Sequence, residues 1–221
     1  MTLLRVSGGL SSIDPSCPES VSGHARTKFY QKFKRLADVA VVLASAPAVL
    51  LVVLIATAAI YLREGRPIFF TQDRVGRGGR IFRMVKLRTM TPELRSEQIA
   101  TVKNDPRITP LGRFLRQSHI DELPQLWNIL AGHMTLIGPR PEQPALVDHY
   151  REKLPNYDLR HAVPPGLSGW AQVNFGYAAN LAETARKLDY DLEYVQRYGP
   201  LMDFIIVVRT FRIFLDPRYV R

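Results

Sequence analysis

The sequence predicts an α+β protein in which a membrane-inserted helical segment precedes a small, mostly helical domain. A charge-free apolar run extends from Val39 to Leu62. Two β-prone runs separated by glycines follow it, and helical periodicity dominates after residue 110. This order divides the chain into a flexible N-terminal tail (1–27), a membrane segment (28–62) and a domain at the cytosolic face (63–221).

Composition narrows the range of partners. The chain has 221 residues, with 30 basic and 20 acidic side chains and a net charge of +10. This balance predicts an anionic partner, which is a nucleic acid, an anionic lipid or a phosphorylated substrate. One cysteine excludes an intramolecular disulfide and fits a reducing environment. The first 27 residues are rich in Ser, Gly and Pro and contain no signal peptide pattern.

The apolar run predicts insertion into a membrane. At about 1.5 Å per residue, Val39–Leu62 reaches roughly 36 Å, enough for a hydrocarbon layer of about 30 Å. Basic residues flank it on both sides, so neither end favours translocation. Pro47, close to Ser45, removes a helix hydrogen bond inside the run. We therefore expect a re-entrant helix-break-helix with both ends cytosolic, and a simple kinked span is the alternative. Asp38 is expected to form a structural ion pair with Arg35.

A β-hairpin is predicted after the membrane segment. The runs Ile68–Gln72 and Arg80–Leu87 are joined by Gly76-Arg77-Gly78-Gly79. A glycine loop that cradles phosphate is the alternative, but the Lys-Ser/Thr of a P-loop is missing. Lys86 and Arg88 alternate with apolar residues, so they share one face. That face either binds an anion or is simply solvated.

The stretch Ser118–Glu142, SHIDELPQLWNILAGHMTLIGPRPE, is predicted to begin as a short helix. Ser118 is the expected N-cap of a capping box with Asp121, and Gly132 is the expected C-terminal stop. Asp121 and Glu122 then lie in the first turn, at the positive end of the helix dipole.

Two cations accompany these acids. Arg140 sits in the rigid turn Gly138-Pro139-Arg140-Pro141, and Arg116 precedes the helix. Two carboxylates and two arginines around a helix N-terminus suit chemistry on a phosphate. Ordinary capping acids and an ordinary turn would give the same local pattern.

The whole string SHIDELPQLWNILAGHMTLIGPRPE closely resembles the signature of the bacterial sugar transferases, the monotopic phosphoglycosyl transferases. VGRGGRIFRMVKLRTM, NDPRITPLGRFLRQ and PGLSGWAQVN resemble further elements of the same family, in the same order. The chain departs from the family at Ala46, where a serine usually precedes Pro47, and at Pro164, where an arginine is common.

This resemblance implies transfer of a sugar 1-phosphate from a UDP-sugar to undecaprenyl phosphate, with release of UMP. The enzyme would work at the cytoplasmic face of the bacterial inner membrane, among membrane lipids, and start synthesis of exopolysaccharide, capsule or O-antigen repeat units. Asp121 would be the nucleophile of a covalent aspartyl-phosphosugar intermediate, and Glu122 would bind Mg²⁺ or act as general base. The expected phosphate-binding residues are Lys86, Arg88, Arg116 and Arg140.

Other features leave alternatives open. Gln172 and Asn174 are weak candidates for contacts with a base or sugar, and Asp189 and Asp191 read as a solvated helix face or a metal site. Asp203–Leu215 suits the membrane interface or packing against the membrane segment.

The rival functions are a membrane-anchored scaffold, a polyanion-binding protein and a metal-dependent phosphohydrolase. No nucleic-acid partner is expected, because the sequence lacks a recognised binding motif. The sugar, glucose, galactose or another, is not determined, and the oligomeric state is open between a monomer and a homodimer.

Overall fold

The computed structural model describes residues 24–91, 105–175 and 180–215. The expectations for the N-terminal tail before residue 24 and for part of the segment between the hairpin and Pro110 lie outside these ranges. The elements are α1 His24–Glu64, β1 Phe69–Val75, η1 Arg77–Gly79, β2 Ile81–Leu87, α2 Pro110–Gln117, η3 Ile120–Glu122, α3 Gln125–Leu130, β3 Thr135–Ile137, α4 Pro144–Lys153, η4 Tyr157–Ala162, β4 Gly166–Ser168, α5 Trp170–Asn174, α6 Leu181–Gln196 and α7 Pro200–Leu215.

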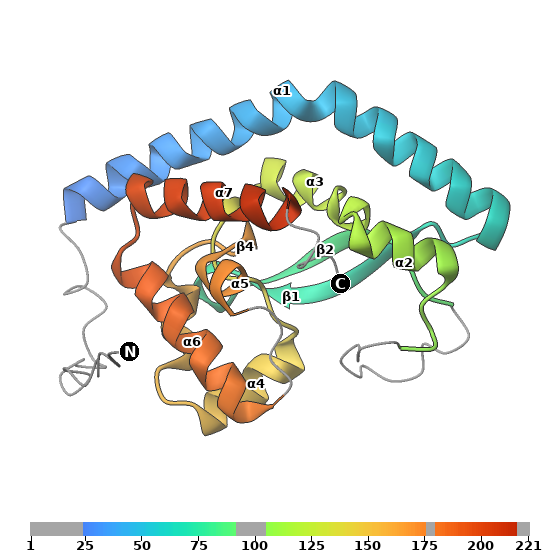
Figure 1. The fold of residues 1–221 in the computed structure, drawn as a ribbon. Coiled ribbons are helices and arrows are strands. Elements are labelled where there is room, and N and C mark those ends of the chain that lie inside the picture. Colours follow the sequence, from blue (N-terminus) through green and yellow to red (C-terminus); the bar gives the residue numbers. More distant parts are fainter. Residues whose placement is uncertain (1–23, 92–104, 176–179, 216–221) are drawn as a thin grey trace, which may run out of the picture.

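The predicted membrane segment, 28–62, lies within one helix of 41 residues, α1, which has Pro47 inside it. The predicted break at Pro47 is therefore a bend in a continuous helix, which Figure 1 shows as an arch. Proline has no N–H to donate to the preceding turn, and its ring pushes that turn aside, which bends a helix without ending it. The Ser45 hydroxyl donates to the Val42 carbonyl at 3.1 Å, beside the bend.

The predicted hairpin is confirmed. β1 and β2 pair antiparallel, in a register that runs from Phe69 opposite Leu87 to Val75 opposite Ile81. Its turn contains Gly78 and Gly79 at φ of 64° and 76°, a left-handed conformation that glycine adopts without strain. A second sheet, which the sequence did not predict, pairs the short strands β3 and β4 in parallel.

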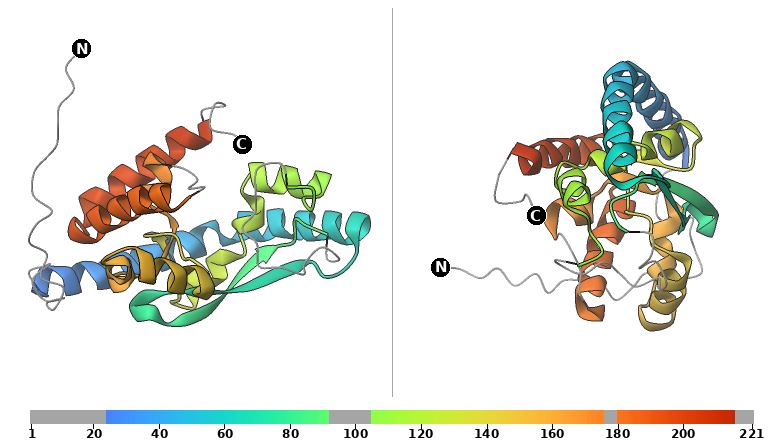
Figure 2. Two further views of the ribbon diagram at one scale, coloured as in Figure 1. Left: turned by 90° about the horizontal axis from the view of Figure 1, so that it is seen from below. Right: turned by 90° about the vertical axis from the view of Figure 1, so that its right-hand side faces the viewer.

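α1 covers one side of the molecule, and both of its halves are anchored to the hairpin. Val42, before the bend, packs with Phe82 and Met84 of β2. Ala56 and Ile60, after the bend, form a second cluster in which Leu87 is the β2 residue. Figure 1 and the right-hand view of Figure 2 show α4 at the end of the molecule opposite α1. In Figure 1, α6 runs from α4 toward the start of α7.

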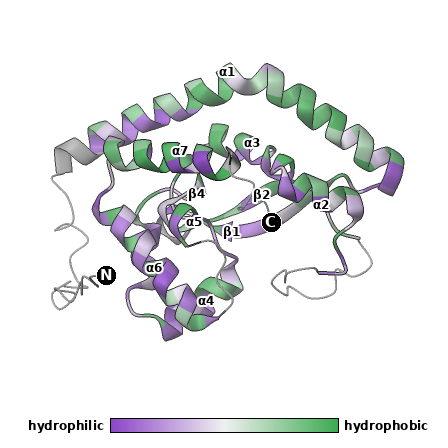
Figure 3. Ribbon diagram, in the orientation of Figure 1, coloured by the Kyte–Doolittle hydropathy of each residue, from purple (hydrophilic) through white to green (hydrophobic). Residues whose placement is uncertain are grey.

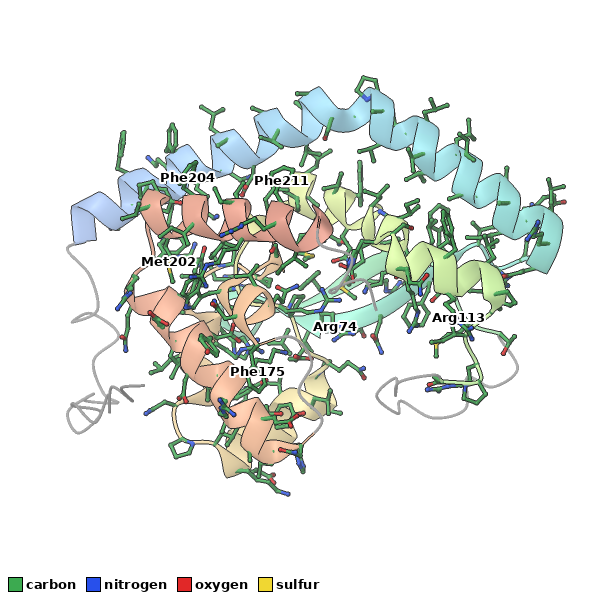
Figure 4. All side chains as sticks on the ribbon, in the orientation of Figure 1. Arg74, Arg113, Phe175, Met202, Phe204 and Phe211 are labelled. Carbon is green, nitrogen blue, oxygen red and sulfur yellow. The ribbon has the colours of Figure 1, made fainter. Side chains whose placement is uncertain are left out.

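Hydrophobic residues predominate along α1 and α7 (Figure 3). The segment Lys28–Glu64 is the one helix among the described residues that is long and apolar enough to cross a membrane, and only 11% of its most apolar part is buried. α7 is also two-sided, because Met202 is 5% exposed whereas Phe204 and Phe211 are both 65% exposed. Figure 4 shows Met202 on the α6 side of α7 and the two phenylalanines on the other. This exposed apolar face fits a lipid environment.

Candidate active site

The adjacent carboxylates Asp121 and Glu122 lie in η3, a single 3₁₀ turn between α2 and α3. The predicted capping box is wrong. Helix α2 begins at Pro110 behind the N-cap Thr109, and Ser118 ends it, with its hydroxyl donating to the Phe114 carbonyl at 2.8 Å.

His119 follows Ser118 with a left-handed φ of 56°, which turns the chain sharply before the two acids. The expected stop at Gly132 is confirmed, since it follows α3 with φ 83°.

Glu122 is held by two cations. Its Oε1 accepts hydrogen bonds from Lys86 Nζ at 2.7 Å and from Arg140 Nη2 at 2.6 Å. Burial alone would raise the pKa of Glu122, but Arg140 and Lys86 outweigh it and bring the pKa below its usual range. Glu122 is therefore a fixed anion that joins β2 to the Gly138–Glu142 turn.

Asp121 has the opposite environment. It is 6% exposed, and its carboxylate accepts no hydrogen bond from the described residues. Burial raises the pKa of Asp121, the neighbouring Glu122 raises it further, and Lys86 and Arg116 act against the shift. A desolvated carboxylate without fixed donors retains its lone pairs for a reacting atom.

Arg116 lies on the α2 side of this pair. Its Nε donates to Thr89 Oγ1 at 2.8 Å, which fixes the plane of the guanidinium. Its two Nη atoms have no hydrogen-bond partner within the described segments. Lys86, Arg116 and Arg140 therefore surround two carboxylates with three cations, an arrangement suited to phosphate oxygens.

Arg88 is the predicted phosphate ligand that the structure places elsewhere. It is 4% exposed, and its Nη2 donates to the carbonyls of Glu64 and Gly65 at 2.9 and 3.1 Å. The Glu64 carboxylate lies 3.4 Å from the same nitrogen. The carbonyls at a helix C-terminus attract cations, so Arg88 stabilises the end of α1 rather than joining Lys86.

The predicted ion pair between Asp38 and Arg35 is also wrong. The Asp38 carboxylate accepts from the Thr135 hydroxyl at 2.5 Å and from the Leu136 N–H at 3.4 Å. Arg35 donates to the last carbonyls of α3, including that of Leu130 at 2.7 Å. Both side chains satisfy backbone or hydroxyl groups on other elements, which sequence neighbours cannot reveal.

A second layer of charge behind the Gly138–Glu142 turn was not predicted. It comprises Arg74, Glu142, Arg160, Lys187 and Asp191. Glu142 contacts Lys187 Nζ at 2.7 Å and Arg74 Nη1 at 3.6 Å, and Arg160 pairs with Asp191 at 2.7 Å. Figure 4 shows Arg74 in the middle of the molecule. Asp191 is 2% exposed, so its expected place on a solvated face is wrong. The sequence could have indicated Glu142, because this residue directly follows Pro139-Arg140-Pro141. No sequence pattern marks Arg160 or Asp191 as part of this layer.

The segment Pro164–Asn174 borders the same turn, as its resemblance to the family implied. A Cβ on Gly166 or Gly169 would lie 2.0 or 2.2 Å from backbone atoms of Gly138, so only glycine permits this approach. The Gln172 amide donates to the Leu167 carbonyl at 3.1 Å and that of Asn174 to the Trp170 carbonyl at 2.7 Å. Their amide donors are therefore bound within the domain.

Magnesium is the expected cofactor, and Glu122 is the carboxylate of the pair that is expected to bind it. Within the described residues no group of three His, Cys, Asp or Glu side chains forms a complete metal cluster. Mg²⁺ needs only one or two carboxylates when substrate phosphates supply other ligands. Among the described residues, Glu122 Oε2 accepts one hydrogen bond, a long one of 3.4 Å from Arg140 Nη1, and therefore retains acceptor capacity. Glu122 fits such an ion together with a bound diphosphate.

The described residues thus combine one long, exposed apolar helix with two adjacent carboxylates beside three cations. The chain belongs to the bacterial sugar transferase family, because the model of that family matches residues 29–217. It is 40% identical over 188 residues to the UDP-N-acetylgalactosamine-undecaprenyl-phosphate N-acetylgalactosaminephosphotransferase of Aeromonas hydrophila, covering 84% of this chain and 44% of that protein.

Two further relatives are similar to this chain. The UDP-glucose:undecaprenyl-phosphate glucose-1-phosphate transferase of Xanthomonas campestris pv. campestris is 43% identical over 150 residues, which are 65% of this chain and 31% of that protein. The uncharacterized sugar transferase EpsL of Bacillus subtilis is 36% identical over 179 residues, covering 81% of this chain and 85% of EpsL. The chain thus spans less than half the length of the first two relatives and most of the third.

Proposed function

We propose that the protein transfers a sugar 1-phosphate from a UDP-sugar to undecaprenyl phosphate, giving undecaprenyl-diphosphate-sugar and UMP. The observation that carries the proposal is the buried Asp121, free of hydrogen bonds from the described residues, beside three cations. Relatives from Aeromonas and Xanthomonas are named for this type of transfer. The product would begin a repeat unit of exopolysaccharide, capsule or O-antigen.

In the first step, an Asp121 carboxylate oxygen attacks the β-phosphorus of the donor. The bond between that phosphorus and the bridging oxygen breaks, and UMP leaves with the electron pair. Lys86, Arg116 and Arg140 bind the phosphate oxygens on which charge develops. The fixed Glu122 keeps Lys86 and Arg140 in place while Asp121 reacts.

Glu122 and the donor diphosphate are the groups that would hold Mg²⁺. The ion supplies neutralisation of the diphosphate and of the leaving UMP. Glu122 as a general base is the weaker assignment, because Lys86 and Arg140 keep its pKa below the usual range.

In the second step, a phosphate oxygen of undecaprenyl phosphate attacks the same phosphorus and expels the Asp121 carboxylate. This acceptor must approach from the membrane. The exposed apolar surfaces of α1 and α7 offer such an approach, because Leu50 and Leu54 of α1 are 67% and 66% exposed. Two steps through one aspartate predict ping-pong kinetics.

We also propose that α1 enters and leaves the membrane on one side, the cytoplasmic face of the inner membrane. Lys34, in its N-terminal half, pairs with Asp203 of α7, and the carbonyl of Glu64, at its C-terminal end, accepts from Arg88. A helix that crosses a bilayer separates its ends by about 30 Å of hydrocarbon. Contacts of both ends with one domain, and the bend around Pro47, favour the re-entrant course. A homodimer stays a prediction.

The test is release of UMP from UDP-glucose, UDP-galactose and UDP-N-acetylgalactosamine by detergent-purified protein, with undecaprenyl phosphate and Mg²⁺. We expect release by the wild type and none by Asp121→Asn. If no donor supports release, binding of the same nucleotide sugars separates an untested sugar from a non-catalytic scaffold. Release of inorganic phosphate from undecaprenyl diphosphate without any donor would instead identify a phosphohydrolase.

A further inference from the structure

The turn that carries Arg140 is held through its backbone carbonyls. Each carbonyl from Pro139 to Glu142 accepts a hydrogen bond from another part of the chain, and the donors belong to β4, η4 and β1. The donors are, in order, Gly166 N at 2.9 Å, Arg160 Nη2 at 2.8 Å, Arg74 Nη1 at 3.1 Å and Val75 N at 2.9 Å. Pro139 and Pro141 have no N–H, so the turn depends on these acceptor contacts for its place.

The contact to the Arg140 carbonyl comes from a buried ion pair. Arg160 and Asp191 have side chains that are 3% and 2% exposed. Arg160 donates to Asp191 Oδ2 from Nη2 at 2.7 Å and from Nε at 3.0 Å, and its Nη1 donates to the Tyr157 hydroxyl at 3.1 Å. The contacts with Asp191 and Tyr157 therefore fix the orientation in which the Arg160 guanidinium donates to the Arg140 carbonyl.

We propose that Arg160, held by Asp191, is a positioning residue that acts through Arg140. The inference rests on the proposed function. The carbonyl and the guanidinium of Arg140 belong to one residue: Arg160 contacts the carbonyl, and Glu122 contacts the guanidinium at 2.6 Å. A shift of the Arg140 peptide moves the guanidinium relative to Asp121 and the donor phosphate. Misplacement by about 1 Å costs on the order of 10²-fold in rate.

The variant that isolates this role is Arg160→Met/Asp191→Leu. Removal of one partner alone leaves a buried charge unpaired, whereas apolar replacement of a whole buried pair often preserves stability. We expect UMP release to fall about 30-fold, in kcat more than in KM, from a variant that still folds and unfolds cooperatively. Arg151→Met, which removes the exposed pair with Asp158, is the control and should leave the rate unchanged.

Arg140→Lys, made in the wild type and in the double variant, completes a cycle. If Arg160 acts through Arg140, the Arg140→Lys loss is at least about 5-fold smaller in the double-variant background. Multiplicative losses, or a folded double variant with wild-type kcat, would overturn the inference. If the double variant does not fold, Arg160→Lys takes its place in the cycle, because lysine keeps a charge beside Asp191 but lacks the guanidinium fork. A wild type that neither releases UMP from any donor nor binds a nucleotide sugar would instead contradict the proposed function itself.

Discussion

Two adjacent carboxylates divide the site into two regions with opposite physics. Around Glu122, hydrogen bonds from Lys86 and Arg140 fix the anion, and the pKa of Glu122 lies below its usual range. Around Asp121, no hydrogen bond from the described residues reaches the carboxylate, and burial raises its pKa. Where neighbouring environments push two pKa values apart, the groups have different roles. This difference supports the proposed roles, with Asp121 as the nucleophile and Glu122 as the anion that holds Lys86 and Arg140 in place.

The largest effect should come from Asp121→Asn. UMP release should fall at least about 10³-fold, because the amide is not a nucleophile. The unfolding midpoint should not fall, since the substitution removes a charge whose burial is unfavourable. Turnover assays and thermal scans on the same sample check both. An Asp121→Asn variant that releases UMP at the wild-type rate would contradict the distinction between Asp121 and Glu122.

Removal of Mg²⁺ comes next. Chelation with EDTA should lower UMP release about 10²-fold, because the diphosphate charge is no longer neutralised. Within the described residues no three-ligand cluster preassembles a metal site, so the donor-free unfolding midpoint should stay unchanged. Restored turnover with Mg²⁺ is the control. A large fall in the midpoint on chelation would indicate a structural metal instead.

Glu122→Gln should affect rate and stability together. Lys86 and Arg140 lose their shared counter-charge, and we expect a loss of about 10²-fold in rate. The cost in unfolding free energy is about 2 kcal/mol, below the 3–5 kcal/mol typical of deeply buried pairs. The discount reflects the 33% exposure of the Arg140 side chain. Denaturant or thermal unfolding measures it. Unchanged stability alongside lost activity would remove the distinction between the two carboxylates.

The smallest expected effect is that of Arg116→Lys, at about 10-fold in rate. Lysine keeps the charge but loses the Nε contact to Thr89 that orients the guanidinium. Arg113→Lys on the exposed side of α2 is the matched control and should have no effect (Figure 4). Equal losses in both variants would show that α2 charge, rather than the oriented Arg116, matters.

Periodicity and local turn chemistry predicted the hairpin, the apolar helix α1 and the stop at Gly132, because each depends on neighbours in sequence. The predicted capping box is wrong because α2 starts earlier, at Pro110, and Ser118 is the C-cap of that helix. Lys86 lies in β2 and Arg88 directly follows that strand, yet Arg88 contacts the end of α1 and not the carboxylate pair. Long-range contacts, which no local pattern encodes, determine where Arg88 lies. They also determine the partners of Asp38 and the buried pair of Arg160 and Asp191.

The central claim is that Asp121 forms a covalent bond to the sugar phosphate, and intact-protein mass spectrometry tests it most directly. The wild type, incubated with an active UDP-sugar and Mg²⁺ but no polyprenyl acceptor, should gain the mass of one sugar phosphate. Undecaprenyl phosphate should remove the added mass, and Asp121→Asn should never acquire it. UMP release that requires both substrates together, with no adduct on the wild type, would contradict the account.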